Sequence, residues 1–257
     1  MKTYHSIFDF KTSKKTILTL GTFDGVHLGH KSILDKLKKG TEKGHYESVV
    51  LTFFPHPRMV LNQDSSIKLL NTIDEKTILL ENFGIDTLII HPFDAAFSNL
   101  TAEDFVKDIL VDQLNIQKII IGYDHRFGKN RTADINDLIA FGEKYGFEVE
   151  QISAQEIDSV SVSSTKIRDA IANGTMAVAN EFLGYNYILS GKMELLIDGF
   201  TGSVLKHLSK EYLVNLQIPI PKSEQKIIEW VVKISKPYDE KNSKQNKIKE
   251  LEEYVQN

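Results

Sequence analysis

The sequence predicts an α/β protein built on a doubly wound parallel sheet, followed by a short, mainly helical C-terminal tail. Three observations support this fold class. Short apolar runs alternate with amphipathic helical patterns from the start of the chain to about residue 184. Runs such as "SVVLTFF" and "KIIIG" are apolar at neighbouring positions, as in strands that are covered on both faces. Clusters of polar residues then follow the strands, where such a sheet binds its ligands.

Five segments are expected to form the strands of this sheet. Each is short, is rich in β-branched or aromatic residues, and ends at glycine, proline or a polar cluster. In chain order they are Thr16–Thr22, Ser48–Phe54, Thr87–Ile90, Lys118–Gly122 and Phe147–Ile152.

Five further segments carry the periodicity of amphipathic helices. In the third of them Phe105 and Ile109 recur at helical spacing, and Thr101 stands where an N-cap is expected. Glycine follows three of them at the place of a C-cap, at Gly84, Gly146 and Gly174. The predicted helices are His30–Lys39, Asp74–Asn82, Ala102–Leu114, Ile135–Tyr145 and Thr165–Asn173.

The composition is that of an ordinary globular protein and excludes several classes. The chain has 257 residues, of which 41% are hydrophobic and 26% charged, and its net charge of −4 gives no general attraction to nucleic acid or anionic membranes. It contains no cysteine, which excludes disulfides and thiolate metal sites. No signal peptide is recognisable, and no uncharged apolar run approaches the roughly 18–20 residues of a membrane span. A cytoplasmic protein without a membrane partner is expected.

The stretch "LGTFDGVHLGH" (residues 20–30) directly follows the first predicted strand. Glycines after a strand let the backbone approach a ligand closely, and the N-terminus of the next helix offers free N–H groups to an anion. His27 and His30 are three residues apart, so both would face the same side of a helical turn. Two other interpretations stay open here, namely a zinc pair lacking its remaining ligands and a tight turn with incidental surface histidines.

Three more polar clusters follow predicted strands. "FFPHPRMVL" places His56 between two prolines, and "IIIGYDHRFGKNR" offers Asp124 and Arg126. "VSVSSTKIRDAI" places hydroxyl side chains at a helix start with Lys166 and Arg168 in its first turn, where cations oppose the helix dipole unless an anion lies nearby. Each cluster alone is commonly a shaped loop or a solvated surface turn. Together they indicate one ligand-binding edge of the sheet.

In this order and spacing, "GTFDGVHLGH", "FFPHP", "GYDHRFGKNR" and "VSSTKIRDAI" resemble the FMN adenylyltransferase module of bacterial bifunctional FAD synthetases. That module belongs to the nucleotidyltransferases with a His-x-Gly-His signature on a Rossmann-like fold. The resemblance covers about residues 10–190. It implies transfer of AMP from ATP to FMN, giving FAD and pyrophosphate, with Mg²⁺ accompanying ATP and without a covalent enzyme intermediate.

The resemblance also implies roles for individual residues. Arg168 would neutralise the charge of the leaving pyrophosphate, and His27 and His30 would act beside it as the other catalytic residues. His125 stands where an aromatic residue is more usual, and the resemblance names no metal ligand. The implied ATP-binding residues are Gly21, Phe23, Asp24, Gly25, Gly29, Ser163, Ser164 and Thr165. The implied flavin-binding residues are His56, Asp124, Arg126 and Phe127.

The second part of the chain departs from that family. Bifunctional members continue into a riboflavin kinase barrel with a Pro-Thr-Ala-Asn type motif, whereas this chain contains no Pro-Thr pair. Kinase activity is therefore not expected. Residues 191–257 instead resemble a fragment of a type I restriction-modification specificity subunit, on the stretch "QIPIPKSEQKI" and the helical patterns around it. This segment contains no arginine, which argues against DNA reading, and its amphipathic helices favour self-association.

Two domains are therefore expected, an FMN adenylyltransferase domain at 1–190 and the tail at 191–257. The first alternative is a related nucleotidyltransferase acting on another phosphate acceptor, such as pantetheine phosphate or nicotinamide mononucleotide. The second is a restriction-associated interaction protein acting through its C-terminal helices, and the third a remnant that binds flavin without turnover.

Overall fold

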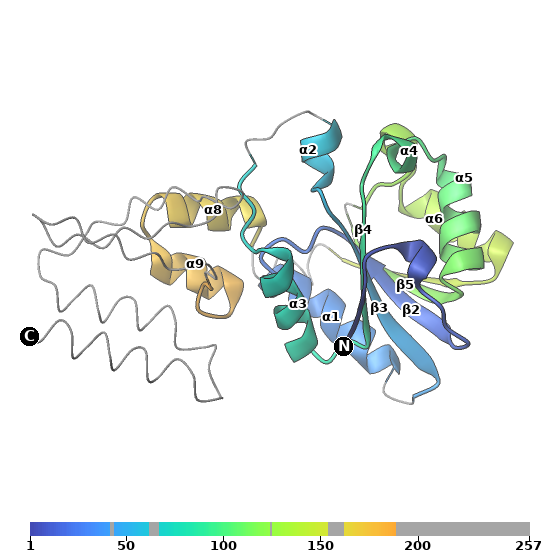
Figure 1. Cartoon of the computed structure of the whole chain (residues 1–257), viewed down its shortest axis with the longest axis horizontal. Helices are drawn as coiled ribbons and strands as arrows, with labels where there is room; N and C mark the ends of the chain where they lie inside the picture. Colours follow the sequence, from blue (N-terminus) through green and yellow to red (C-terminus); the bar gives the residue numbers. More distant parts are fainter. Residues whose placement is uncertain (42–43, 62–66, 124, 154–161, 189–257) are drawn as a thin grey trace, which may run out of the picture.

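The computed structural model describes residues 1–41, 44–61, 67–123, 125–153 and 162–188 of the chain. Within them, six strands form one sheet in the order β1-β4-β3-β2-β5-β6, and all neighbours pair in parallel (Figure 1). The predicted fold class is confirmed. The strands are β1 Lys2–Tyr4, β2 Lys15–Leu20, β3 Tyr46–Phe53, β4 Thr87–His91, β5 Ile116–Gly122 and β6 Glu148–Ile152.

Helices cover both faces of the sheet because its central strands are mainly buried on both sides. On β2, Ile17 packs with the helices α1 and α3, whereas its neighbour Leu18 faces the opposite layer, which contains η2 and α6. The helices are α1 Leu28–Thr41, α2 Pro57–Leu61, α3 Ile73–Asn82, α4 Ala95–Ser98, α5 Ala102–Asp104, α6 Ile135–Tyr145, α8 Ser164–Ala172 and α9 Met176–Leu183, with the shorter or wider turns η1 Ile7–Asp9, η2 Phe105–Gln113 and η3 Lys129–Arg131.

Local capping signals locate several helix ends correctly. Thr101 caps α5 by accepting a hydrogen bond from the backbone N–H of Asp104, and Gly146 ends α6 in the left-handed region with φ +78°. Helix α6 has the predicted bounds. Gly84 and Gly174 also have positive φ, one residue beyond the C-caps of α3 and α8.

The structure differs from the predicted elements in several places, and the short elements α2, α4, η1 and η3 were not predicted. The segment expected as one helix over Ala102–Leu114 continues from α5 as a π-helix, with the Leu114 N–H donating to the Ile109 carbonyl. Its wider turns still place Phe105, Ile109 and their apolar neighbours against the sheet. Strand β1 was not predicted because three residues are too few to show a period, and α9 was not predicted either.

Helices α8 and α9 pack together beside the α1 and α3 layer (Figure 1). Among the described residues no helix is both long and apolar enough to cross a membrane. The domain boundary near residue 190, the C-terminal helices, their self-association and the restriction-subunit resemblance all concern residues 189–257, which lie outside the described residues.

Candidate active site at the carboxyl edge of the sheet

The turn after β2 lies where the direction of the strand order reverses. From β2 the chain passes to β3 on one side, while β5 lies against β2 on the other side. In a doubly wound sheet, the crevice outside the carboxyl ends of two such strands is the usual ligand site. The turn Gly21–His27 leaves β2 at this point, and the "GYDHRFGKNR" loop leaves β5 beside it.

The turn after β2 has a strained backbone. Phe23, Gly25 and Val26 all have positive φ, of +45°, +86° and +37°. A left-handed conformation costs a non-glycine residue free energy, so it persists only where surrounding contacts enforce it. Here Phe23 and Val26 are buried in the core, and the Thr22 carbonyl accepts hydrogen bonds from Lys76 and Thr52. The turn is therefore held rigidly before any ligand binds.

Gly25 is expected to be the least replaceable glycine of this turn. Besides its positive φ, an added Cβ would lie 2.7 Å from Cδ1 of the buried Leu70. Gly25→Ala should lower the free energy of unfolding by about 3 kcal/mol, combining left-handed strain with overpacking. Gly146→Ala is the matched control, since Gly146 has φ +78° but nothing within 4 Å, and about 1 kcal/mol is expected. Equal losses in urea unfolding of the two variants would contradict the packing argument.

His27 and His30 lie together at the start of α1. Their rings stack with centroids 3.8 Å apart, and the His30 ring also packs against Phe23 at 4.9 Å. Burial lowers the pKa of His27 to about 4 and the pKa of His30 well below its usual value, so both imidazoles are neutral at pH 7. The Nδ1 atoms of both are buried without a hydrogen-bond partner among the described residues. Neutral rings with unused polar atoms suit binding of an external polar group.

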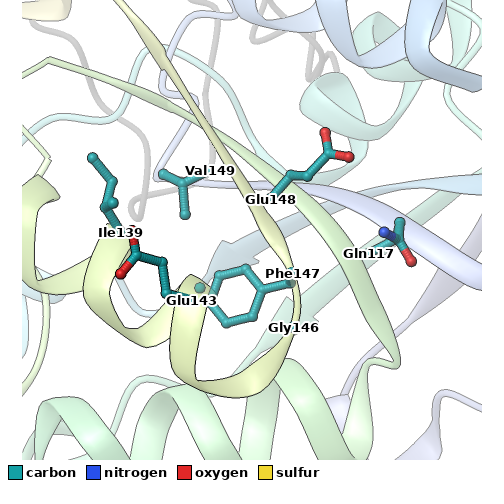
Figure 2. Close-up of a pocket in the computed structure, with 8 residues that line it drawn as sticks. Gln117, Ile139, Glu143, Gly146, Phe147, Glu148 and Val149 are labelled. Carbon is teal, nitrogen blue, oxygen red and sulfur yellow. The ribbon is translucent and has the colours of Figure 1, made fainter.

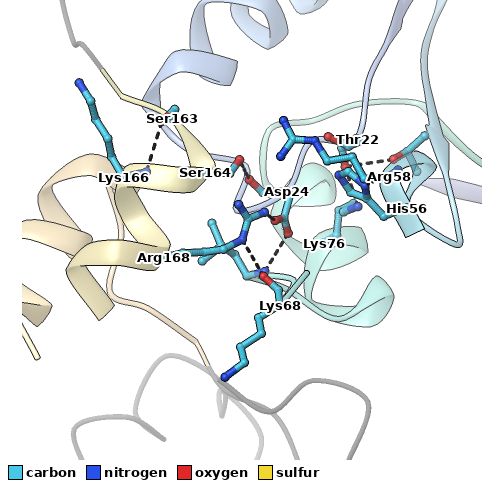
Figure 3. A network of polar contacts seen from close by, with 12 residues as sticks. Thr22, Asp24, His56, Arg58, Lys68, Lys76, Ser163, Ser164, Lys166 and Arg168 are labelled. Carbon is cyan, nitrogen blue, oxygen red and sulfur yellow. Dashed lines mark hydrogen bonds and ion pairs between the residues drawn. The ribbon is translucent and has the colours of Figure 1, made fainter. Parts of the chain in front are cut away.

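The second motif lies directly against this turn. Ser163 caps α8 by accepting from the Lys166 N–H, and the Ser164 hydroxyl donates to the Asp24 carbonyl at 2.8 Å (Figure 3). A Cβ on Gly29 would lie 3.1 Å from the His27 ring and 3.6 Å from the Val162 carbonyl oxygen. The histidines and the helix start that carries Ser163 and Ser164 therefore share one site. Thr165, by contrast, is exposed.

Asp24 connects the two motifs and pairs with one of the two cations of α8, Arg168. Its side chain is only 2% exposed, and its two carboxylate oxygens accept from the Leu70 N–H and from the Arg168 guanidinium (Figure 3). Arg168 also donates through Nε to the Lys68 carbonyl at 2.6 Å. The anion expected near the first turn of α8 is therefore, in this structure, Asp24. Arg168 lies beside the predicted phosphate site and is held in place by these contacts.

His56 and Lys76 lie on the other side of the same turn (Figure 3). The His56 Nδ1 accepts from the Arg58 N–H at 3.1 Å. Burial lowers the pKa of His56 to about 4, with Asp24 opposing this effect and the cations Lys76, Arg168 and Arg58 adding to it. One carboxylate and three cations thus act on this imidazole, and the local excess of positive charge suits an anionic ligand.

The remaining residues predicted to bind flavin are less closely associated with the histidines and the start of α8. Arg126 is exposed in the loop after β5, and Asp124 lies outside the described residues. Phe127 is buried in the hydrophobic core, with its ring 6.0 Å from that of Phe105 and 6.2 Å from that of His125. The roles of these residues stay predictions.

A surface pocket of about 450 Å³ lies elsewhere in the fold (Figure 2). It is formed where α6 ends and β5 and β6 begin, which is the opposite end of the sheet from the histidines. Its lining residues are Gln117, Ile139, Gly142, Glu143, Gly146, Phe147, Glu148 and Val149, none of which was predicted to bind a ligand. The candidate site is defined by its convergent polar groups and not by this hollow.

Two site residues were missed in the sequence. Lys76 stands three and four residues from Ile73, Leu79 and Leu80, on the apolar face of its helix, and that position was a signal that it is buried. Tyr185, whose hydroxyl donates to the Gly25 carbonyl at 2.6 Å, follows α9 and carried no such signal. The zinc interpretation finds no support, since the described residues contain no group of three or more His, Asp or Glu able to hold a metal.

The fold and the site together are those of an α/β nucleotidyltransferase. The features that this class combines are a doubly wound parallel sheet, a glycine-rich turn with paired imidazoles and a Ser-Ser helix start. The FAD synthetase family model matches residues 9–166, so the chain belongs to the FAD synthetase family.

Several relatives are named bifunctional riboflavin kinase/FMN adenylyltransferase. Those of Buchnera aphidicola subsp. Schizaphis graminum and Escherichia coli K12 are 37% and 34% identical to this chain over 71% and 69% of its length. The matches span only 59% and 56% of these two proteins. A crystal structure described as a macrolide-efflux protein from Streptococcus pneumoniae superposes with a TM-score of 0.63 at 27% identity, covering 71% of this chain and 59% of that one.

Proposed function

We propose that the chain is an FMN adenylyltransferase, which joins AMP from ATP to FMN and releases pyrophosphate. The observation that carries this proposal is the convergence of His27, His30, Arg168 and the α8 N-terminus around one strained turn. The turn and the helix start offer backbone N–H groups, and the neighbouring cations favour phosphates. The name of the relatives supports the same reaction.

In the proposed reaction a phosphate oxygen of FMN attacks the α-phosphorus of ATP. A new P–O bond forms to the AMP phosphorus as the bond to the β-phosphate oxygen breaks, and pyrophosphate carries away the electron pair. No protein nucleophile is required. The protein holds the two anions in line and neutralises the charge that develops, with neutral His27 and His30 donating hydrogen bonds and Arg168 supplying a fixed positive charge.

Magnesium fits this site as a companion of ATP. Both carboxylate oxygens of Asp24 already accept hydrogen bonds, and the described residues hold no cluster of metal-ligating side chains. Because Mg²⁺ is commonly bound through substrate phosphates and water, we propose that it enters with the triphosphate, whose charge it reduces. Both substrates are phosphorylated metabolites, in keeping with the expected cytoplasmic location. The restriction-associated alternative has no support among the relatives.

The proposal is tested by supplying Mg-ATP with either FMN or riboflavin and measuring FAD by mass and fluorescence. FAD and pyrophosphate are expected from FMN. Riboflavin is the matched control, because it lacks the phosphate that must attack ATP, and no FAD is expected from it. Absence of FAD from FMN would refute the proposal. Pantetheine phosphate and nicotinamide mononucleotide serve as further acceptors, and a larger yield with either would assign the chain to another substrate.

A further inference from the structure

Lys76 is a buried amine that no predicted motif contains. It lies on α3, is 5% exposed, and donates from Nζ to the Thr22 carbonyl at 2.7 Å. A lysine is rarely buried unless its amine has a specific partner. The partner of the Lys76 amine is the carbonyl of Thr22, near the start of the strained turn.

The charged and titratable side chains near Lys76 come from other parts of the fold. Asp24 of the turn favours its charged form, and Lys76 in turn acts on the pKa values of His30 of α1 and His56 of the loop after β3. Arg168 of α8 is a second cation near Asp24, with which it forms an ion pair. It makes no contact with the Thr22 carbonyl among those described, so that contact belongs to Lys76. The ammonium group therefore lies within electrostatic reach of two of the three imidazoles of the site.

We propose that Lys76 is a positioning residue of the phosphate site, whose buried ammonium holds the Thr22 carbonyl and places a positive charge beneath the bound triphosphate. This inference rests on the proposed function for the identity of the ligand. The hydrogen bond fixes the start of the turn that leads to His27, and the charge attracts the phosphates. Lys76 contacts the turn and not the reacting atoms.

Thr52 makes it possible to separate the hydrogen bond from the charge. Its hydroxyl is a second donor to the Thr22 carbonyl, at 3.2 Å. Thr52→Val removes a donor and leaves the ammonium, whereas Lys76→Met removes both a donor and a charge and leaves Thr22 with one partner. Lys39→Met, on the exposed end of α1, is the control for removing a lysine from the surface.

The pH dependence supplies a readout that a merely structural lysine would not move. Burial lowers the pKa of Lys76 to about 8, so its charge is present below pH 8 and is lost as the pH rises through 8. Burial also raises the pKa values of Tyr185 and Tyr187, and those of His27, His30 and His56 are lowered. Among the described groups of this site whose pKa is displaced from its usual value, Lys76 is therefore the one that titrates between pH 7.5 and 9.

The experiment measures kcat and KM for ATP in FAD formation from pH 6.5 to 9.5 for the wild type and the three variants. At pH 7, Lys76→Met should lower kcat/KM for ATP about tenfold through loss of a charge-assisted hydrogen bond. The wild type should lose activity above pH 8, and this decline should be absent from Lys76→Met. Thr52→Val should keep the decline, and Lys39→Met should match the wild type throughout.

The proposal is overturned if Lys76→Met stays within twofold of the wild type at pH 7 or still shows the decline above pH 8. If the wild type forms no FAD, the proposed function fails separately, and calorimetric affinity for Mg-ATP becomes the readout. Weaker binding by Lys76→Met would then support the proposal, and equal binding would overturn it. Should Lys76→Met not fold, the Mg-ATP affinity of the wild type must itself fall above pH 8.

Discussion

His30→Ala is expected to lower kcat for FAD formation by about 10²–10³-fold, the usual effect of removing one donor that stabilises developing charge. The His30 ring is held between Phe23 and His27, with centroid distances of 4.9 and 3.8 Å, and burial keeps it neutral. As a neutral imidazole it carries one N–H, which we expect to donate a hydrogen bond to a phosphoryl oxygen. The measurement is the steady-state rate of FAD formation under saturating Mg-ATP and FMN.

Two controls keep this result interpretable. His45→Ala removes an exposed histidine that precedes β3 and should leave turnover unchanged. His30→Asn keeps a donor of smaller reach and should lose less activity than alanine. Because the ring packs against Phe23, thermal melting must show that His30→Ala is folded at the assay temperature. A folded His30→Ala protein with turnover near the wild-type rate would remove His30 from the catalytic machinery.

Arg168→Met is expected to impair both stability and activity. It would leave the Asp24 carboxylate, 2% exposed, buried without its cation, and breaking such a pair typically costs about 3–5 kcal/mol. For a domain of this size that loss corresponds to a fall in Tm of roughly 10 °C. Exposed Arg131→Met is the control, with no comparable fall expected.

The double variant Asp24→Asn/Arg168→Met separates the two roles of Arg168. Removing the carboxylate together with its cation leaves no unpaired buried charge, so much of the lost stability should return, as in a double-mutant cycle. FAD formation should stay low, because the guanidinium donors of Arg168 beside the proposed phosphate site are still missing. Full recovery of turnover in the double variant would show that Arg168 serves only to neutralise Asp24.

Much of the fold followed from local signals. The buried strands were recognisable because both faces of each are apolar, and the end of α6 was recognisable because Gly146 follows it. The π-helix over Phe105–Gln113 was not recognisable, since its apolar residues also satisfy ordinary helical spacing. Strand β1 was missed because only its pairing with β4 distinguishes it from a coil.

The site was predictable in its motifs but not in its internal connections. The glycine-rich turn, the histidines and the Ser-Ser helix start could each be located because each follows a strand. That Asp24 would pair with Arg168 depends on how α8 packs against the turn, which no local pattern encodes. Tyr185 was missed for the same reason, since its partner is a backbone carbonyl distant in sequence. The position of Lys76 on the apolar face of α3 indicated burial, but its partner carbonyl is equally distant in sequence.

The parallel sheet has a consequence for how the protein folds. Within the part of the chain that the structure describes, no pair of adjacent strands can form as a local hairpin. The turn after β2 is closed by contacts that span 144 residues from Asp24 to Arg168 and 160 from Gly25 to Tyr185. Such long loop closures slow folding, so we expect the candidate site to be completed late. A ligand that binds only the completed site then stabilises the folded chain, by about 2.7 kcal/mol when present at a hundred times its Kd.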